Sequence, residues 1–220
     1  MHIKKHIKKF NITVLLIKSI GIMRFVPLIA IDVFALGLIL LSGFGREAPE
    51  ETVLDFLLVS QFFFPVFSIW WSVFILREFT DANGSELIYT ICHKSLLAYI
   101  IKPFLILLLN VAALLGICTA FCNIFIWEFA RILSVCIFYF GMIYCVSMFS
   151  RSTSISLFAI IIYTLVCMVF RGEEPSFPLY MSQWMIQADS ILKVCLPLLI
   201  CGIILLVAGR FGEKRLYTNL

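Results

Sequence analysis

The sequence predicts an all-α membrane protein in which six transmembrane helices form a single domain over residues 1–220. Of its 220 residues, 62% are hydrophobic and only 14% are charged, and the mean hydropathy is +1.07. Soluble domains are about half apolar and about one-quarter charged, so this composition is typical of a chain in a lipid bilayer. Because one transmembrane helix takes about 20 residues, six helices with short connections fill the chain.

Residues 1–24 are predicted to form an amphipathic helix on the inner membrane surface. Apolar residues recur at intervals of four and three while lysines occupy the other faces, which is the pattern of an interfacial helix. The apolar positions are Ile3, Ile7, Phe10, Val14 and Ile17, and the lysines are Lys4, Lys5, Lys8, Lys9 and Lys18. The alternative is a basic tail that only sets the topology.

Six apolar segments follow, separated by polar connections. They cover residues 25–44, 53–75, 96–118, 132–149, 155–170 and 191–208. Glu128 and Arg131 are expected in a short outer turn before the fourth segment. Residues 171–190 contain two prolines and an amphipathic half. This pattern predicts a broken outer hairpin of short helices that dips into the outer leaflet between the fifth and sixth segments.

Two polar residues interrupt the apolar segments. Asp32 lies in the first segment, and because an ionisable group is costly in hydrocarbon, it is expected to face other helices or water. The alternative is that its side chain reaches toward the membrane interface. Asn110 lies in the middle of the third segment and is expected to form a hydrogen bond between helices.

The distribution of lysine and arginine predicts that both termini are cytoplasmic. Inner segments hold 13 of the 17 lysine and arginine residues, and outer segments hold the other 4. The outer ones are Arg46, Arg131, Arg171 and Lys193. The positive-inside rule therefore places residues 77–95, between the second and third apolar segments, on the cytoplasmic side of the cell membrane.

Residues 77–95 carry the signals of a short capped helix. Ser85 can serve as the N-cap, and Glu86 then lies in the first turn, where a carboxylate favours the helix dipole. His93 and Lys94 lie in the last turn, where cations are favoured. Turn-forming residues that end at Gly84 precede this helix. The pattern predicts a cytoplasmic contact surface, and the alternative is a solvated connector.

Several kinds of site are not predicted for this chain. The string G-x-x-x-x-G-K-[ST] of a phosphate-binding loop is absent, so ATP hydrolysis must come from another subunit. Six of the eight cysteines lie inside or at the ends of apolar runs without paired spacing. Cys118 and Cys122, four residues apart, are the alternative pair for a disulfide or a metal, but no histidine or further cysteine lies near them in sequence. The histidines, His2, His6 and His93, all lie in polar segments. We therefore expect no catalytic residue, metal site or cofactor in this chain. Its net charge of +4 follows from membrane sidedness, so nucleic acid is not an expected partner.

The arrangement resembles the membrane subunit of an ABC-2-type transporter. Shared features are an inner-leaflet helix before the first span, a cytoplasmic loop between the second and third spans, and a broken outer hairpin before the sixth. Family members carry an acidic residue, a Gly-Thr-x-Glu-Leu-Leu-like string and a Pro-x-Ser/Arg turn. The similar residues here are Arg77-Glu78, Gly84-Ser85-Glu86-Leu87-Ile88 and His93-Lys94-Ser95. Glu86 comes one position earlier than in the family pattern, and His93 replaces the proline.

The resemblance implies a permease that dimerises with an identical or related subunit in the lipid bilayer. A separate ABC ATPase subunit, with its ATP and magnesium, would drive export of an amphiphile such as an antimicrobial peptide, drug or lipid-linked molecule. The residues expected to contact the ATPase are Glu78, Gly84, Ser85, Glu86, His93 and Lys94. Asp32 and Asn110 are the candidates for lining the pathway. The alternatives are a substrate-binding membrane subunit of a vitamin importer and a membrane-embedded enzyme.

Overall fold

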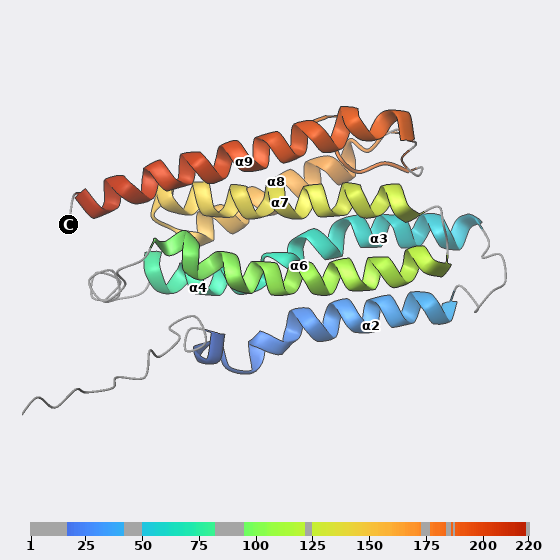
Figure 1. Cartoon of the computed structure of the whole chain (residues 1–220), viewed down its shortest axis with the longest axis horizontal. Coiled ribbons are helices and arrows are strands. Elements are labelled where there is room, and N and C mark those ends of the chain that lie inside the picture. The colour runs from blue at the N-terminus through green and yellow to red at the C-terminus, as the bar shows by residue number, and fades with distance from the viewer. Residues whose placement is uncertain are drawn as a thin grey trace, which may run out of the picture.

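A computed structural model describes residues 17–41, 50–81, 95–121, 125–172, 177–183, 186 and 188–218. The named elements within these residues are all helices, and they lie along one long axis as an elongated bundle (Figure 1). They are η1 (Gly21–Phe25), α2 (Val26–Leu41), α3 (Glu50–Ser68), α4 (Trp70–Thr80), α6 (Leu96–Phe121), α7 (Phe125–Ser150), α8 (Thr153–Val169) and α9 (Ala188–Thr218).

Among the described residues, four helical stretches are long and apolar enough to cross a membrane, as in a multi-pass membrane protein. They are Leu58–Thr80, Leu96–Ile117, Ile126–Ser150 and Ser190–Arg215. The remaining apolar helices, α2 and α8, have 16 and 17 residues. At about 1.5 Å per residue, each rises roughly 25 Å, which is less than the thickness of a typical hydrocarbon core.

Apart from α3 and α4, which follow one another along a single apolar stretch, successive long helices run in opposite directions, so the bundle has two distinct ends. At one end α4, α7 and α9 finish and α6 and α8 begin, on the left of Figure 1, where the C-terminus is marked. We call this the basic end, because it holds a group of lysine and arginine residues. They are Arg77, Arg151, Arg210, Lys214 and Arg215. At the opposite end α7 and α9 begin and α8 finishes.

The second apolar segment is divided between two helices, α3 and α4, with the break at Ile69, one turn after Pro65. Proline has no N–H, so the carbonyl of Gln61 loses its usual donor four residues along the helix. The Tyr180 hydroxyl donates to that carbonyl instead, at 3.4 Å. The Ser68 hydroxyl donates to the carbonyl of Pro65 at 2.7 Å, and α4 then begins after Ile69.

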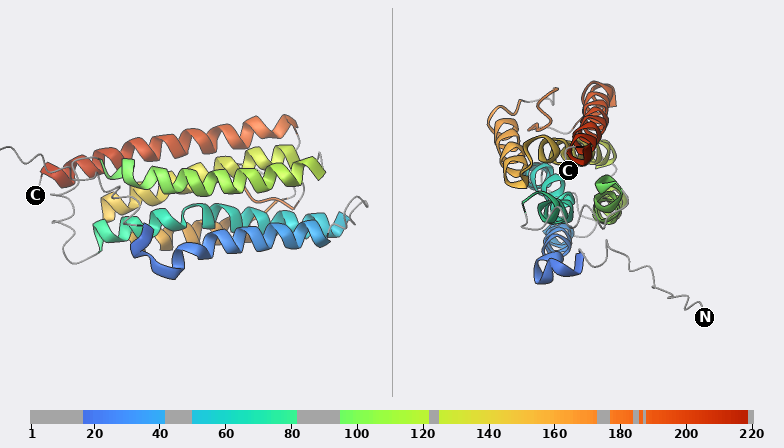
Figure 2. Two further views of the ribbon diagram at one scale, coloured as in Figure 1. Left: turned by 60° about the horizontal axis from the view of Figure 1, so that its bottom comes forward. Right: turned by 90° about the vertical axis from the view of Figure 1, so that its left-hand side faces the viewer.

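Helices α7 and α9 pack closely because glycines face each other across their interface. A Cβ atom added to Gly141 would overlap the carbonyl oxygen of Gly202. One added to Gly209 would lie 2.6 Å from the ring of Tyr144. The two helices lie side by side in the ribbon views (Figure 2). Such small residues let helix backbones approach within a membrane.

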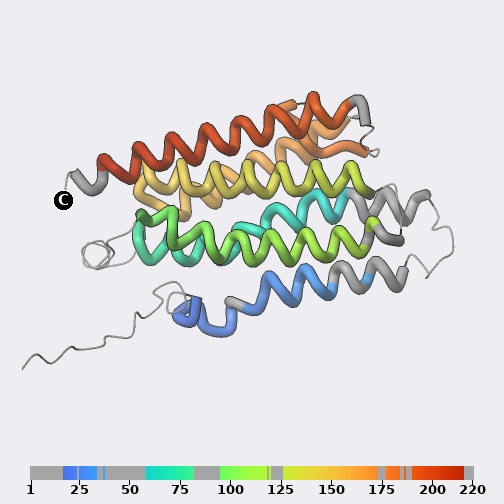
Figure 3. The backbone as a smooth tube through the Cα atoms, viewed as in Figure 1, coloured from blue at the N-terminus to red at the C-terminus, as the bar shows by residue number. Residues whose placement is uncertain are grey.

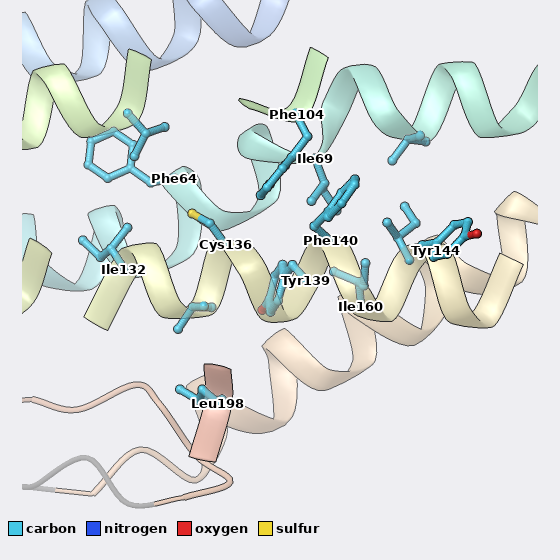
Figure 4. Close-up of a cluster of buried hydrophobic side chains, with 14 of the residues drawn as sticks. Phe64, Ile69, Phe104, Ile132, Cys136, Tyr139, Phe140, Tyr144, Ile160 and Leu198 are labelled. Atoms are coloured by element: carbon cyan, nitrogen blue, oxygen red, sulfur yellow. The ribbon is translucent and has the colours of Figure 1, made fainter. Parts of the chain in front are cut away.

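The core lies where α7 meets α3, α4, α6, α8 and the inner face of α9. Phe104 and Phe140 stack with their ring centroids 4.1 Å apart, and Figure 4 shows them between the side chains of Phe64 and Tyr144. Large apolar side chains on α8 and α9 instead lie exposed on the outside of the bundle. They include Phe158, Ile161, Leu165, Leu192, Ile200 and Ile203. An exposed apolar surface of this kind suits contact with lipid.

The structure corrects three expectations about the connections. Glu128 and Arg131 do not lie in an outer turn, because α7 already begins at Phe125 and carries both residues. The sixth helix, α9, extends to Thr218 rather than ending near residue 208. The described residues 177–183 form turns and an isolated bridge from Ser182 to Gly172, not short helices. The expected interfacial helix falls mostly outside the described residues, which begin at Ile17 (Figure 3).

Candidate functional site

Five of the six expected ATPase contact residues lie in a part of the chain that the structure does not describe. Gly84, Ser85, Glu86, His93 and Lys94 lie outside the described residues. Glu78 is described and lies in α4, where it is partly buried. The described chain nevertheless reaches both ends of this loop, at Asp81 and at Ser95, and both ends make specific contacts with distant helices.

At the first end of the loop, Asp81 caps the N-terminus of α8. The backbone N–H of Thr153, the first residue of α8, donates to both carboxylate oxygens of Asp81, at 3.3 and 3.2 Å. Ser152 occupies the N-cap position of this helix but makes no side-chain cap bond. A carboxylate at a helix N-terminus satisfies an otherwise unpaired donor and favours the helix dipole. The hydroxyls of Thr80 and Thr153, 2.7 Å apart, reinforce the contact.

At the second end of the loop, Glu213 of α9 caps the N-terminus of α6. The backbone N–H of Leu96, the first residue of α6, donates to Glu213 Oε1 at 2.8 Å. The Ser95 hydroxyl donates to Glu213 Oε2 at 3.2 Å, and the Tyr144 hydroxyl of α7 also donates to Oε2. Glu213 therefore joins α6, α7 and α9 at the basic end.

The charge of Glu213 is compensated inside the protein. The side chain is fully buried, and a buried carboxylate is costly unless it is paired and hydrogen-bonded. Arg210, one turn earlier on α9, donates to Glu213 Oε2 at 2.8 Å while its own side chain remains 41% exposed. Arg210 and three further donors thus supply hydrogen bonds to both oxygens of the Glu213 carboxyl group.

The structure brings together the two polar residues of the apolar segments. Asn110 Nδ2 of α6 donates to Asp32 Oδ1 of α2 at 3.2 Å. The expected hydrogen bond of Asn110 between helices is thus confirmed, and its partner is Asp32. Both side chains are partly buried, where α2 packs against α6. The contact links the edge helix α2 to the rest of the bundle.

A second buried cluster holds the connection between α8 and α9 at the opposite end of the bundle. Glu128 and Arg131 form a buried ion pair one turn apart on α7. Glu128 Oε1 accepts a hydrogen bond from the N–H of Ile186 at 2.7 Å, and Arg131 donates to the carbonyl of Tyr180 at 3.2 Å and to the hydroxyl of Ser182 at 2.6 Å. These bonds satisfy polar backbone groups of a non-helical segment.

Tyr180 and Ser182 place the same segment against α3 and α7. The side-chain oxygen of Gln61 accepts a hydrogen bond from the N–H of Ser182 at 3.2 Å. The hydroxyls of Tyr180 and Tyr139 lie 2.8 Å apart. Burial raises the pKa of the Tyr180 hydroxyl well above its usual value, so this group stays protonated and can donate.

Sequence reasoning missed both Glu213 and the buried role of Glu128 and Arg131. Glu213 lies among basic residues, and these residues indicate only on which side of the membrane the C-terminus lies. The opposite charges of Glu128 and Arg131, three residues apart beside an apolar run, are a spacing that suits a pair on one helix face. That spacing could have suggested a longer fourth helix.

Comparisons with protein families, with curated proteins and with solved structures find no match to this chain. Its function must therefore be argued from its own residues and contacts.

Proposed function

We propose that this chain is the permease subunit of an ABC-2-type transporter in the cell membrane, with both termini in the cytoplasm. A separate ATPase subunit would bind ATP and magnesium and dock on residues 77–95. A second permease subunit, identical or related, would complete the pathway. The substrate would be an exported amphiphile, such as an antimicrobial peptide, a drug or a lipid-linked molecule.

The observation that carries this proposal is the anchoring of both ends of the loop between α4 and α6. Asp81 holds the first end to α8, and Glu213 holds the second end to α9. A solvated connector needs only enough residues to join two helices, and it does not call for a buried carboxylate at one end. A loop that receives a partner has to be held in place against the helices that the partner moves.

The distribution of charge supports the same assignment. We infer from the positive-inside rule that the basic end lies toward the cytoplasm, and the two described ends of the loop, Asp81 and Ser95, are at this end. An ATPase subunit works in the cytoplasm, where ATP is available. The four long apolar stretches are also what a permease requires.

Recovery of the tagged chain from its native membrane in mild detergent tests the proposal. We expect a protein with a phosphate-binding loop to be recovered with it, to be identified by mass spectrometry, and the purified chain alone to have no ATPase activity. ATP hydrolysis by the purified chain alone, or the absence of any such partner, would contradict the proposal.

Substitutions in the loop test where the ATPase docks. Glu86→Lys and Gly84→Pro should leave expression and membrane insertion near the wild-type level, because both positions lie in the loop predicted outside the apolar segments, and substitutions at surface positions usually change stability by less than about 0.5 kcal/mol. Both should reduce recovery of the ATPase and its substrate-stimulated activity. Arg171→Glu, a charge reversal in the connection between α8 and α9, is the control and should change neither. Normal recovery and activity in both loop variants would remove the docking role from this loop.

A further inference from the structure

We propose that Asp81 and Glu213 are positioning residues through which α7 and α8 couple the two ends of the bundle. A displacement of the end of α4 or of the start of α6 would then alter the hydrogen bonds that position residues 177–183 at the opposite end. The role of this coupling rests on the proposed function, since an ATPase at the basic end would have to affect the far side of the membrane. The contacts that carry it are independent of that function.

Helix α7 provides the first connection, because it contacts an anchor at one end and the far segment at the other. Near the basic end, the Tyr144 hydroxyl donates to Glu213. Near the opposite end, Arg131 donates to the carbonyl of Tyr180 and to the hydroxyl of Ser182. Tyr144 and Arg131 are both buried in one continuous helix, Phe125–Ser150. A shift of this helix along its axis therefore affects both groups of contacts.

Helix α8 provides the second connection in the same way. Its first residue, Thr153, donates its backbone N–H to Asp81. Two to three turns further along, the Tyr163 hydroxyl donates to the carbonyl of Pro178 at 2.6 Å. The hydroxyl of Thr164 lies 2.6 Å from that of Tyr139, which in turn contacts Tyr180. Helix α8 thus links Asp81 to the same far segment.

The two helices are tied to each other, so their displacements are not independent. The hydroxyls of Ser147 on α7 and Ser156 on α8 lie 2.7 Å apart, and both residues are fully buried. Coupling between distant sites passes through rigid elements and hydrogen-bonded contacts of this kind. Residues 177–183 are suited to respond, because turns and hydrogen bonds to side chains of other elements hold them, rather than the backbone hydrogen bonds of a helix.

Hydrogen exchange on the full chain in detergent tests the coupling without any partner. Asp81→Asn and Glu213→Gln keep the side-chain size but remove the charge. We expect exchange at the amides of Thr153 and Leu96, respectively, to rise about fivefold, the effect of a weakened cap. In the double variant, exchange at residues 177–183 should also rise about fivefold, at the low end of coupling between protein sites.

Glu78→Gln is the matched control. It removes a carboxylate from the same end of the bundle, and the side chain of Glu78 makes no hydrogen bond or ion pair with another described residue. Hydrogen exchange at Thr153, at Leu96 and at residues 177–183 should therefore match that of the wild type. If Glu213→Gln does not fold, Tyr144→Phe removes the α7 contact to Glu213 and should produce the same rise at residues 177–183.

A rise confined to Thr153 and Leu96 would show that Asp81 and Glu213 are only local caps, and it would overturn the inference. Exchange unchanged at every position would overturn it as well. The outcome does not depend on an ATPase, so a failure to recover one would contradict the proposed function and leave this test intact.

Discussion

At the scale of single residues, the carboxylates of this protein differ in how their charge is balanced. Glu213 is buried with an arginine one turn away and three further donors. Glu128 is buried against Arg131 and also accepts a backbone N–H. Asp32 accepts one hydrogen bond, from Asn110. The first two are the carboxylates whose removal should affect the fold most, because each satisfies several buried groups.

The ion pair of Glu128 and Arg131 gives a stability prediction. Glu128→Leu leaves the Arg131 guanidinium buried without its counter-ion, which should destabilise the protein by about 3–5 kcal/mol. The double variant Glu128→Leu with Arg131→Met removes both charges and should be more stable than Glu128→Leu alone. Thermal unfolding in detergent measures both. A double variant less stable than the single one would show that the arginine is held mainly by Tyr180 and Ser182.

At the scale of elements, local sequence features decide where helices break or approach. Pro65 precedes the change from α3 to α4, and Tyr180 supplies the donor that the Gln61 carbonyl lacks. Gly141 and Gly202 allow α7 and α9 to come into backbone contact. Helix α7 contacts α3, α4, α6, α8 and α9, which makes it the central element of the bundle (Figure 2).

The contact between α7 and α9 can be tested with one methyl group. Gly141→Ala would place a Cβ against the backbone of Gly202, which cannot move without separating the helices, so we expect a loss of more than about 1 kcal/mol. Gly116→Ala is the control, because no atom lies within 4 Å of the added Cβ. It should leave stability unchanged or raise it, since alanine favours a helix by up to about 1 kcal/mol. Equal unfolding temperatures for the two variants would contradict close packing at Gly141.

At the scale of the whole molecule, α2 lies at the edge of the bundle, against α3 and α6 (Figure 2). Ile29 and Val33 on this helix are 59% and 63% exposed. Asp32, the candidate pathway residue, lies beside Val33 and contacts α6. An ionisable side chain at such an edge is consistent with a pathway between two permease subunits, as the proposed function requires.

Cross-linking tests whether α2 faces a second subunit. Cysteines that replace Ile29 or Val33 should form disulfide-linked dimers in native membranes, because the proposed pathway places two copies of α2 near each other. Ile161→Cys on α8 is the control, since this position is 52% exposed but lies on a different helix. Gel electrophoresis without reducing agent measures the dimer. Cross-linking only at residue 161, or at none of the positions, would count against a pathway along α2.

The sequence by itself determined the class of the protein and the approximate place of its apolar helices. These features depend on hydropathy and segment length, which are local properties of the chain. The third apolar segment, predicted over residues 96–118, is the helix Leu96–Phe121. The hydrogen bond of Asn110 between helices was also predictable, because an amide in hydrocarbon has few other partners.

Only the tertiary structure decided which distant residues share a contact. Leu96 and Glu213 are 117 residues apart in the chain, and their hydrogen bond can form only when α6 and α9 have packed together. Arg131 is similarly held by residues about 50 positions away, in a segment with no regular periodicity. Hydropathy measures the preference of a residue for water or for an apolar environment. It does not predict which distant group forms a hydrogen bond with a buried side chain.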